Sequence, residues 1–185
     1  MQYLVSLEVL ILDQARLITV IVIVLGGVLV LASYAHGLIT NPGKASALWG
    51  GVPQRWLPLY TVSMFMAAAG YLLFTYFFLI HAPNLGIALN YRVLAVIYAS
   101  ILVPSALWMP LTVQMVSNPT PGIWVFIRVI LILVGLAAVA VVITLLSLRP
   151  ISQGALFWVT LAGSVVFLIH TAVLDAIVWP LLFSR

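Results

Sequence analysis

Two charged side chains lie inside the long apolar segments of this sequence, and they are the first candidates for chemistry. Arg128 lies about one turn inside its segment, and Asp175 lies about one to two turns inside another, below the same surface. Because charges at such depth are costly, they are usually paired or functional. If the two segments are neighbours, we expect an Arg128–Asp175 ion pair. In the alternative, Arg128 extends toward lipid headgroups and Asp175 bonds Thr171, one turn earlier.

Three histidines are the next candidates. An enzyme acting on a lipid or isoprenoid could use Asp175 and His170 as acid and base, but five residues along an α-helix separate two side chains by ~140°. A single axial histidine for haem or chlorophyll stays open at His170. His36 and His81 end their segments at opposite surfaces, so the histidines predict no metal site.

Other chemistry is not indicated. The chain has no cysteine, and its seven Lys and Arg residues are scattered, which argues against a thiolate site and against nucleic acid as a partner. We find no paired carboxylates, nucleophile motif or phosphate loop. The sequence therefore predicts no catalytic residues and favours a non-enzymatic role.

The elements that carry these residues are membrane spans. Hydrophobic residues make up 65% of the 185-residue chain and charged residues 5%, with a mean hydropathy of +1.31. Such a composition exceeds what a soluble domain carries and predicts a multi-pass protein of a bacterial inner or organellar membrane, in contact with lipids. A span needs about 20 apolar residues. The predicted spans are about 17–35, 57–80, 93–116, 123–146 and 156–182.

The predicted fold is an all-α integral membrane protein, a five-transmembrane-helix bundle that forms a single membrane domain over residues 1–185. Leu4, Leu7, Leu10 and Ile11 share a helical face, which predicts a short N-terminal interfacial helix before the first span. We name the membrane surface at the start of span 1 side A and the opposite surface side B. Short connections predict that spans 2–3, 3–4 and 4–5 pack as antiparallel hairpins.

The first connection, about residues 36–56, is long and contains Trp49 and Trp56. Long loops in small bundles are usually functional or disordered, and the two tryptophans favour a structured cap on side B. An aromatic belt in the headgroups is the alternative. Tyr60, Trp108 and His170 gather at the same end, and Pro104 and Pro110 are expected to kink span 3 and leave room inside. The pattern indicates an apolar half toward side A and a ligand pocket toward side B.

Three local patterns, together with this topology, resemble the translocator protein family, also called the tryptophan-rich sensory proteins. Span 2 reads Pro58-Leu-Tyr60 and later Gly70-Tyr71-Leu72. Span 3 reads Ser105-Ala-Leu-Trp108-Met-Pro110, similar to the family's Asn-x-x-Trp-x-Pro with Ser for Asn. Span 5 reads Leu174-Asp175-Ala-Ile-Val178-Trp179, similar to its Leu-Asn-x-x-Val-Trp with Asp for Asn.

The resemblance implies a pocket between the helices, capped by the first loop, of a kind that binds tetrapyrroles and sterols. It also implies that the lining includes Tyr60, Ser105, Trp108, Phe167, Thr171, Leu174 and Asp175. The full predicted ligand-binding set is Trp49, Trp56, Tyr60, Ser105, Trp108, Phe167, His170, Thr171, Leu174 and Asp175.

Two functions remain open at this point. One is binding or transport of a flat apolar ligand, with porphyrin, chlorophyll and sterol as the candidates and with Arg128 meeting a propionate. The other is a structural accessory subunit of a large respiratory or photosynthetic complex, because the short loops offer little surface to soluble partners. A homodimer is compatible with either.

Overall fold

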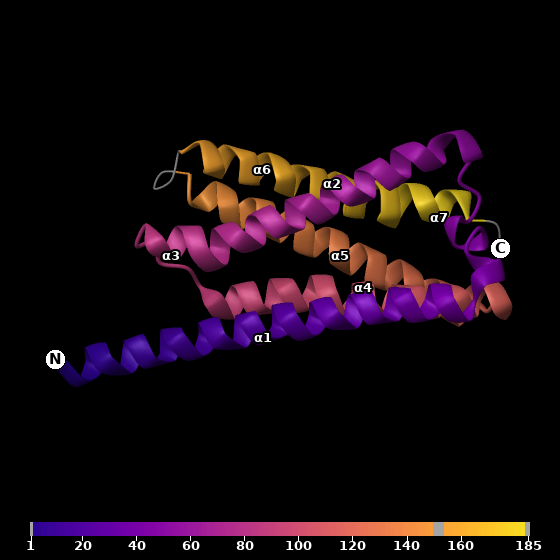
Figure 1. Cartoon of the computed structure of the whole chain (residues 1–185). Helices are drawn as coiled ribbons and strands as arrows, with labels where there is room; N and C mark the ends of the chain where they lie inside the picture. Colours follow the sequence, from indigo (N-terminus) through magenta and orange to yellow (C-terminus); the bar gives the residue numbers. More distant parts are fainter. Residues whose placement is uncertain (1, 150–153, 184–185) are drawn as a thin grey trace.

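Five long helices run back and forth through the structure, a computed structural model (Figure 1). It describes residues 2–149 and 154–183, with side chains from residue 14 onward. Within these ranges the chain is helical and has no strand. The long helices are α1 (Gln2–Thr40), α2 (Leu57–Tyr76), α4 (Tyr91–Ser117), α5 (Pro121–Ser147) and α6 (Ala155–Leu168), which continues through η5 (Ile169–Val178) into α7 (Trp179–Leu182).

All five are long and apolar enough to cross a bilayer. The candidate spans are 27 to 31 residues long, whereas about 20 residues cross a hydrocarbon core. Their bounds are Gln14–Thr40, Gln54–Asn84, Tyr91–Ser117, Pro121–Ser147 and Ala155–Leu182. The protein is therefore an all-α, multi-pass integral membrane protein, as the sequence predicts.

The N-terminal segment differs from the prediction. Residues 2–16 are not a separate interfacial helix, because α1 is one continuous helix of 39 residues. No proline or glycine interrupts this stretch, so nothing in the sequence breaks the backbone hydrogen bonds before span 1. The apolar face of Leu4, Leu7, Leu10 and Ile11 lies outside the described side chains.

The helices pack in the spatial order α1, α4, α5, α6 with η5, and α2 (Figure 1). The predicted hairpins of spans 3–4 and 4–5 are confirmed, since α4 packs on α5 and α5 packs on α6 and η5. The hairpin of spans 2–3 is wrong. After α2 the chain passes through η4 (Phe77–His81) and α3 (Ala82–Asn84), and the extensive contact of α2 is with α6.

Glycine explains this pairing. Gly70 of α2 and Gly163 of α6 face each other, and a Cβ added at Gly70 would lie 2.8 Å from the Gly163 carbonyl carbon. Small residues let membrane helices approach until their backbones touch, which is the main way helices gain packing energy without a hydrophobic driving force. Loop length alone therefore did not decide which helix α2 contacts.

The half of the bundle toward side A is filled by aromatic rings. Phe74, Phe77, Phe78, Tyr98 and Phe157 are all fully buried. The Tyr98 hydroxyl donates to Thr75 Oγ1 at 2.9 Å and links α4 to α2 at this end. The side A half of the bundle is therefore filled by side chains and forms the floor of the cavity described below, which lies in the side B half.

Candidate functional site

A cavity of about 300 Å³ lies in the side B half of the bundle. Its walls come from all the long helices, from η5 and α7, and from the first loop, so no single segment forms it. Most of the lining is apolar or aromatic. Eight of the ten predicted site residues line it, namely Trp49, Tyr60, Ser105, Trp108, Phe167, His170, Thr171 and Asp175.

Trp56 and Leu174 are the two predicted residues that do not line the cavity. Trp56 ends the last turn of the loop, and its side chain is 46% exposed. Leu174 contributes its backbone instead, because its carbonyl accepts a hydrogen bond from the Tyr60 hydroxyl at 3.2 Å. That bond ties α2 to η5 beside the cavity.

The first loop forms the roof of the cavity. It consists of three short 3₁₀ turns, η1 (Pro42–Lys44), η2 (Ala47–Trp49) and η3 (Gln54–Trp56). The Trp49 ring packs edge-on against Tyr60, with centroids 6.4 Å apart. The Leu48 carbonyl accepts a hydrogen bond of 3.1 Å from the Trp179 indole nitrogen, although the two residues are 131 positions apart. The roof is thus fixed to the C-terminal end of the last span.

Aromatic rings form one wall. Trp108 of α4 stacks on Tyr34 of α1, with centroids 5.7 Å apart and planes at 27°, and it meets Trp179 edge-on at 5.8 Å. Pro104 lies one turn before Trp108 and also lines the cavity. Because proline removes one backbone hydrogen bond from the helix, its place beside the cavity fits the predicted opening of span 3.

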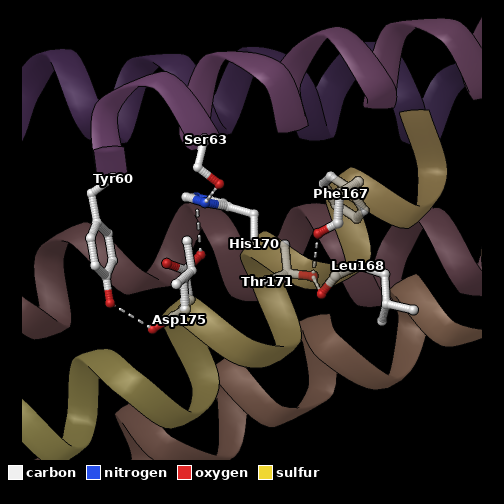
Figure 2. A network of polar contacts seen from close by, with 8 residues as sticks. Tyr60, Ser63, Phe167, Leu168, His170, Thr171 and Asp175 are labelled. Atoms are coloured by element: carbon white, nitrogen blue, oxygen red, sulfur yellow. Dashed lines mark hydrogen bonds and ion pairs between the residues drawn. The ribbon is translucent and has the colours of Figure 1, made fainter. Parts of the chain in front are cut away.

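Three polar side chains, Ser63, His170 and Asp175, form a line of contacts between α2 and η5 (Figure 2). Ser63 Oγ lies 3.0 Å from His170 Nδ1, and His170 Nε2 lies 3.5 Å from Asp175 Oδ2. A carboxylate facing Nε2 favours the neutral tautomer with its proton on Nε2, so Nδ1 accepts from the Ser63 hydroxyl. His170 and Asp175 line the cavity, whereas Ser63 lies behind the histidine, outside the lining.

The local helix type explains how His170 and Asp175 meet. Residues 169–178 form a π-helix, in which residue i bonds residue i+5 instead of i+4. Residues five positions apart therefore lie on the same face of the helix, one turn apart. The ~140° separation expected from α-helical geometry is wrong for this pair, because that geometry does not apply to η5. π-helical turns are often found at functional sites.

The predicted ion pair of Arg128 with Asp175 is not formed. Among the described residues, the Asp175 carboxyl group contacts His170, and Arg128 Nε is buried without a hydrogen-bond partner. The cavity-facing stripe of α5 includes Leu131 and Val134, and Arg128 is not part of it. The alternative partner is also wrong, since the Thr171 hydroxyl donates to the Phe167 carbonyl at 2.9 Å, within its own helix.

Sequence reasoning missed Tyr34, Ser63 and Trp179 as members of this site. Tyr34 lies near the side B end of its span, so its position could have placed it with Tyr60 and Trp108. Trp179 stands in one of the patterns quoted above, where a tryptophan is easily interpreted as a membrane anchor. Ser63 gave no signal, because its partner lies 107 residues away.

The donor atoms of the cavity do not fit a metal centre or an axial haem ligand. No group of three or more His, Asp or Glu side chains that could hold a metal lies together in the described part of the chain. Both ring nitrogens of His170 face protein partners. Binding a chlorophyll or haem metal would require His170 to give up one of these contacts.

Comparison of the chain with protein-family models, with curated proteins and with solved structures gives no match. The resemblance to the translocator protein family therefore stays a prediction from the quoted residues.

Proposed function

We propose that this protein binds or transports a flat apolar ligand of the tetrapyrrole or sterol type in the cavity under the first loop. We further propose that it does so as a relative of the translocator protein family, in a bacterial inner or organellar membrane. A helical bundle supports this location, because proteins of the bacterial outer membrane are typically closed β-barrels. The cavity itself carries the functional proposal.

The strongest support is the combination of volume and lining. Pockets for small molecules typically measure about 300–1,000 Å³ and pair apolar walls with a few well-placed polar groups. This cavity, about 300 Å³, lies at the lower end of that range. Tyr34 and Trp108 contribute aromatic rings to its lining, which suit contact with a planar molecule, and Asp175 and His170 are polar groups able to orient it.

The arrangement also supports retention of a ligand. The rings toward side A are fully buried and close the floor, and the roof is fixed by the bond between Trp179 and Leu48. A ligand that leaves the cavity must therefore pass between helices or displace the loop. On the side of α1 and α2, the lining residues Leu38 and Met64 are 46% and 39% exposed, so this side is the less closed one.

The test is a titration of the purified protein in an uncharged detergent with protoporphyrin and, separately, with a fluorescent sterol. Tryptophan emission is the readout, since Trp49, Trp108 and Trp179 line the cavity. We expect saturable quenching by at least one ligand. Replacement of Trp108 by Ala should weaken binding about tenfold, because it removes both apolar contact and an aromatic face.

Trp158→Ala is the matched control, because Trp158 is 45% exposed and contacts Phe157 and Arg149, away from the cavity. This variant should keep the affinity of the original protein. Titrations that stay linear up to micromolar ligand for both ligands, or an equal loss of affinity in both variants, would reject the proposal.

A structural accessory subunit is the second candidate function, and one observation favours it. α1 has its extensive helix contact with α4 alone, and only 11% of its most apolar window is buried. Such a face contacts either lipid or the helices of a partner. Native electrophoresis of membranes solubilised in mild detergent separates the two. Comigration with a large complex would favour the subunit, whereas a monomer or homodimer would speak against it.

A further inference from the structure

We infer that the cavity selects a planar apolar molecule that carries one protonated amine placed against Asp175, and that it rejects molecules whose polar group is a carboxylate. This inference rests on the proposed function, because it narrows the ligand of the same cavity. Among the proposed ligand types it excludes porphyrins whose polar groups are propionates, so it predicts a flat titration with protoporphyrin and leaves the sterol titration as the test of the proposed function. It also changes the expectation from the sequence, in which Arg128 would meet the propionate of a porphyrin.

The first step is the sign of the charge in the cavity. Among the described residues that line it, Asp175 is the only Asp, Glu, Lys or Arg side chain. Arg128 is not in the lining. In a volume bounded mainly by apolar groups, where charges are weakly screened, a single carboxylate attracts a cation and repels a second anion strongly.

The second step concerns the contacts of the Asp175 carboxyl group. His170 presents Nε2 to Oδ2 of the carboxylate, and Ser63 occupies Nδ1 on the other side of the ring. With its proton on Nε2, the imidazole turns an N–H toward Asp175, and an ionised Asp175 keeps acceptor capacity for a ligand. An ammonium ligand brings the opposite charge that favours the ionised form of a buried aspartate. The described residues supply no hydrogen-bond donor to Oδ1, so its acceptor capacity is free for a ligand.

The third step concerns the hydrogen-bond donors of the lining. The Tyr34 hydroxyl and the indole N–H groups of Trp49 and Trp108 are donors there, so the rejection of a carboxylate rests on its repulsion by Asp175. The other three hydroxyl groups are already engaged. The Tyr60 hydroxyl donates to the Leu174 carbonyl, the Thr171 hydroxyl to the Phe167 carbonyl, and the Ser105 hydroxyl to the Ile101 carbonyl. These groups satisfy their own backbone, so a ligand carboxylate would find no free donor among them. An ammonium group, in contrast, also gains from the aromatic faces that surround the cavity.

The experiment uses three ligands with one planar body. Anthracene carries, at the same ring carbon, an aminomethyl, a hydroxymethyl or a carboxymethyl group. Each is titrated into the purified protein in uncharged detergent at neutral pH, with energy transfer from tryptophan to anthracene as the readout. Titration of empty micelles gives the partition of each probe into the detergent, which is subtracted.

We expect the amine to bind at least tenfold more tightly than the carboxylate, because an ionic hydrogen bond to a buried carboxylate is worth that factor or more. The alcohol should lie between them. In Asp175→Asn the preference for the amine over the alcohol should disappear.

The outcomes separate the two proposals. Equal binding of amine and carboxylate by the original protein would overturn the selectivity and leave the ligand-binding function standing. The comparison needs no variant, so it remains valid even if Asp175→Asn does not fold. Saturable binding of none of the three probes, together with flat titrations of protoporphyrin and sterol, would overturn both proposals.

Discussion

Replacement of Gly70 by Ala is the sharpest test of how this bundle is built. At Gly70 and Gly163 the backbones of α2 and α6 are in direct contact. A Cβ at Gly70 would lie 2.8 Å from the carbonyl carbon and 3.3 Å from the Cα of Gly163. Ordinary contact between carbon atoms requires about 3.5–4.0 Å. The carbonyl oxygen of Gly163 would lie closer still, so the two helices must separate by roughly 1 Å at this crossing.

The cost of that separation can be estimated. A gap of this size forfeits about a quarter to a half of each contact energy across the interface. Overpacking of this kind typically costs about 1–3 kcal/mol. Against this, alanine gains up to about 1 kcal/mol of helix propensity over glycine. The matched control is Gly27→Ala in α1, where an added Cβ meets nothing within 4 Å and only the propensity gain applies.

Because the propensity gain applies to both variants, we expect the free energy of unfolding of Gly70→Ala to be about 1–3 kcal/mol lower than that of Gly27→Ala. The assay is a titration of uncharged-detergent micelles with a denaturing anionic detergent, followed by far-ultraviolet circular dichroism. Because α2 carries Ser63 and η5 carries His170, Gly70→Ala should also weaken binding in the cavity. Equal stability of the two variants would refute the close glycine crossing as the reason for the pairing of α2 with α6.

Three further predictions concern the contacts around the cavity. Trp179→Phe leaves the buried Leu48 carbonyl without its donor, so the loop should exchange its amide hydrogens faster and stability should fall by about 1–3 kcal/mol; unchanged exchange over residues 45–52 would contradict the fixed roof. His170→Gln and Asp175→Asn should be coupled by about 0.5–3 kcal/mol in a double-mutant cycle of unfolding, and a coupling of zero would show that the contact of 3.5 Å contributes nothing. Arg128→Gln and Asp175→Asn should instead be additive within about 0.5 kcal/mol, since no ion pair joins them, and a large coupling would restore the pair.

The contact of His170 with Asp175 could not be predicted from the sequence. The residue types of the two side chains were visible, and the depth of Asp175 marked it as informative. Their geometry was wrong because it was derived from 3.6 residues per turn, whereas the backbone of residues 169–178 is π-helical. No residue type in this segment indicates a π-helix, and the Tyr60 hydroxyl that bonds the Leu174 carbonyl in it comes from a distant helix.

Arg128 shows the same limit for pairs of residues. The depths of Arg128 and Asp175 agree, and α5 does pack on η5 as a pairing would require. Depth gives only one coordinate, however, and the rotation of each helix about its axis gives the other. Rotation is set by side chains along the whole interface, such as the approach of Gly135 to Ala172, which no local pattern reveals.

Composition and the spacing of apolar runs were enough to predict that the protein lies in a lipid bilayer and that it is all-α with five spans. They also predicted that polar residues gather at the side B end. These properties follow from the cost of exposing backbone and charge to lipid, which each segment meets on its own. The tertiary structure alone decided which helices touch, that α2 lies on α6, and that Ser63, His170 and Asp175 come together beside an aromatic wall. Those properties depend on packing between residues far apart in the chain. A single added Cβ or one π-helical turn is enough to change which helices and side chains are in contact.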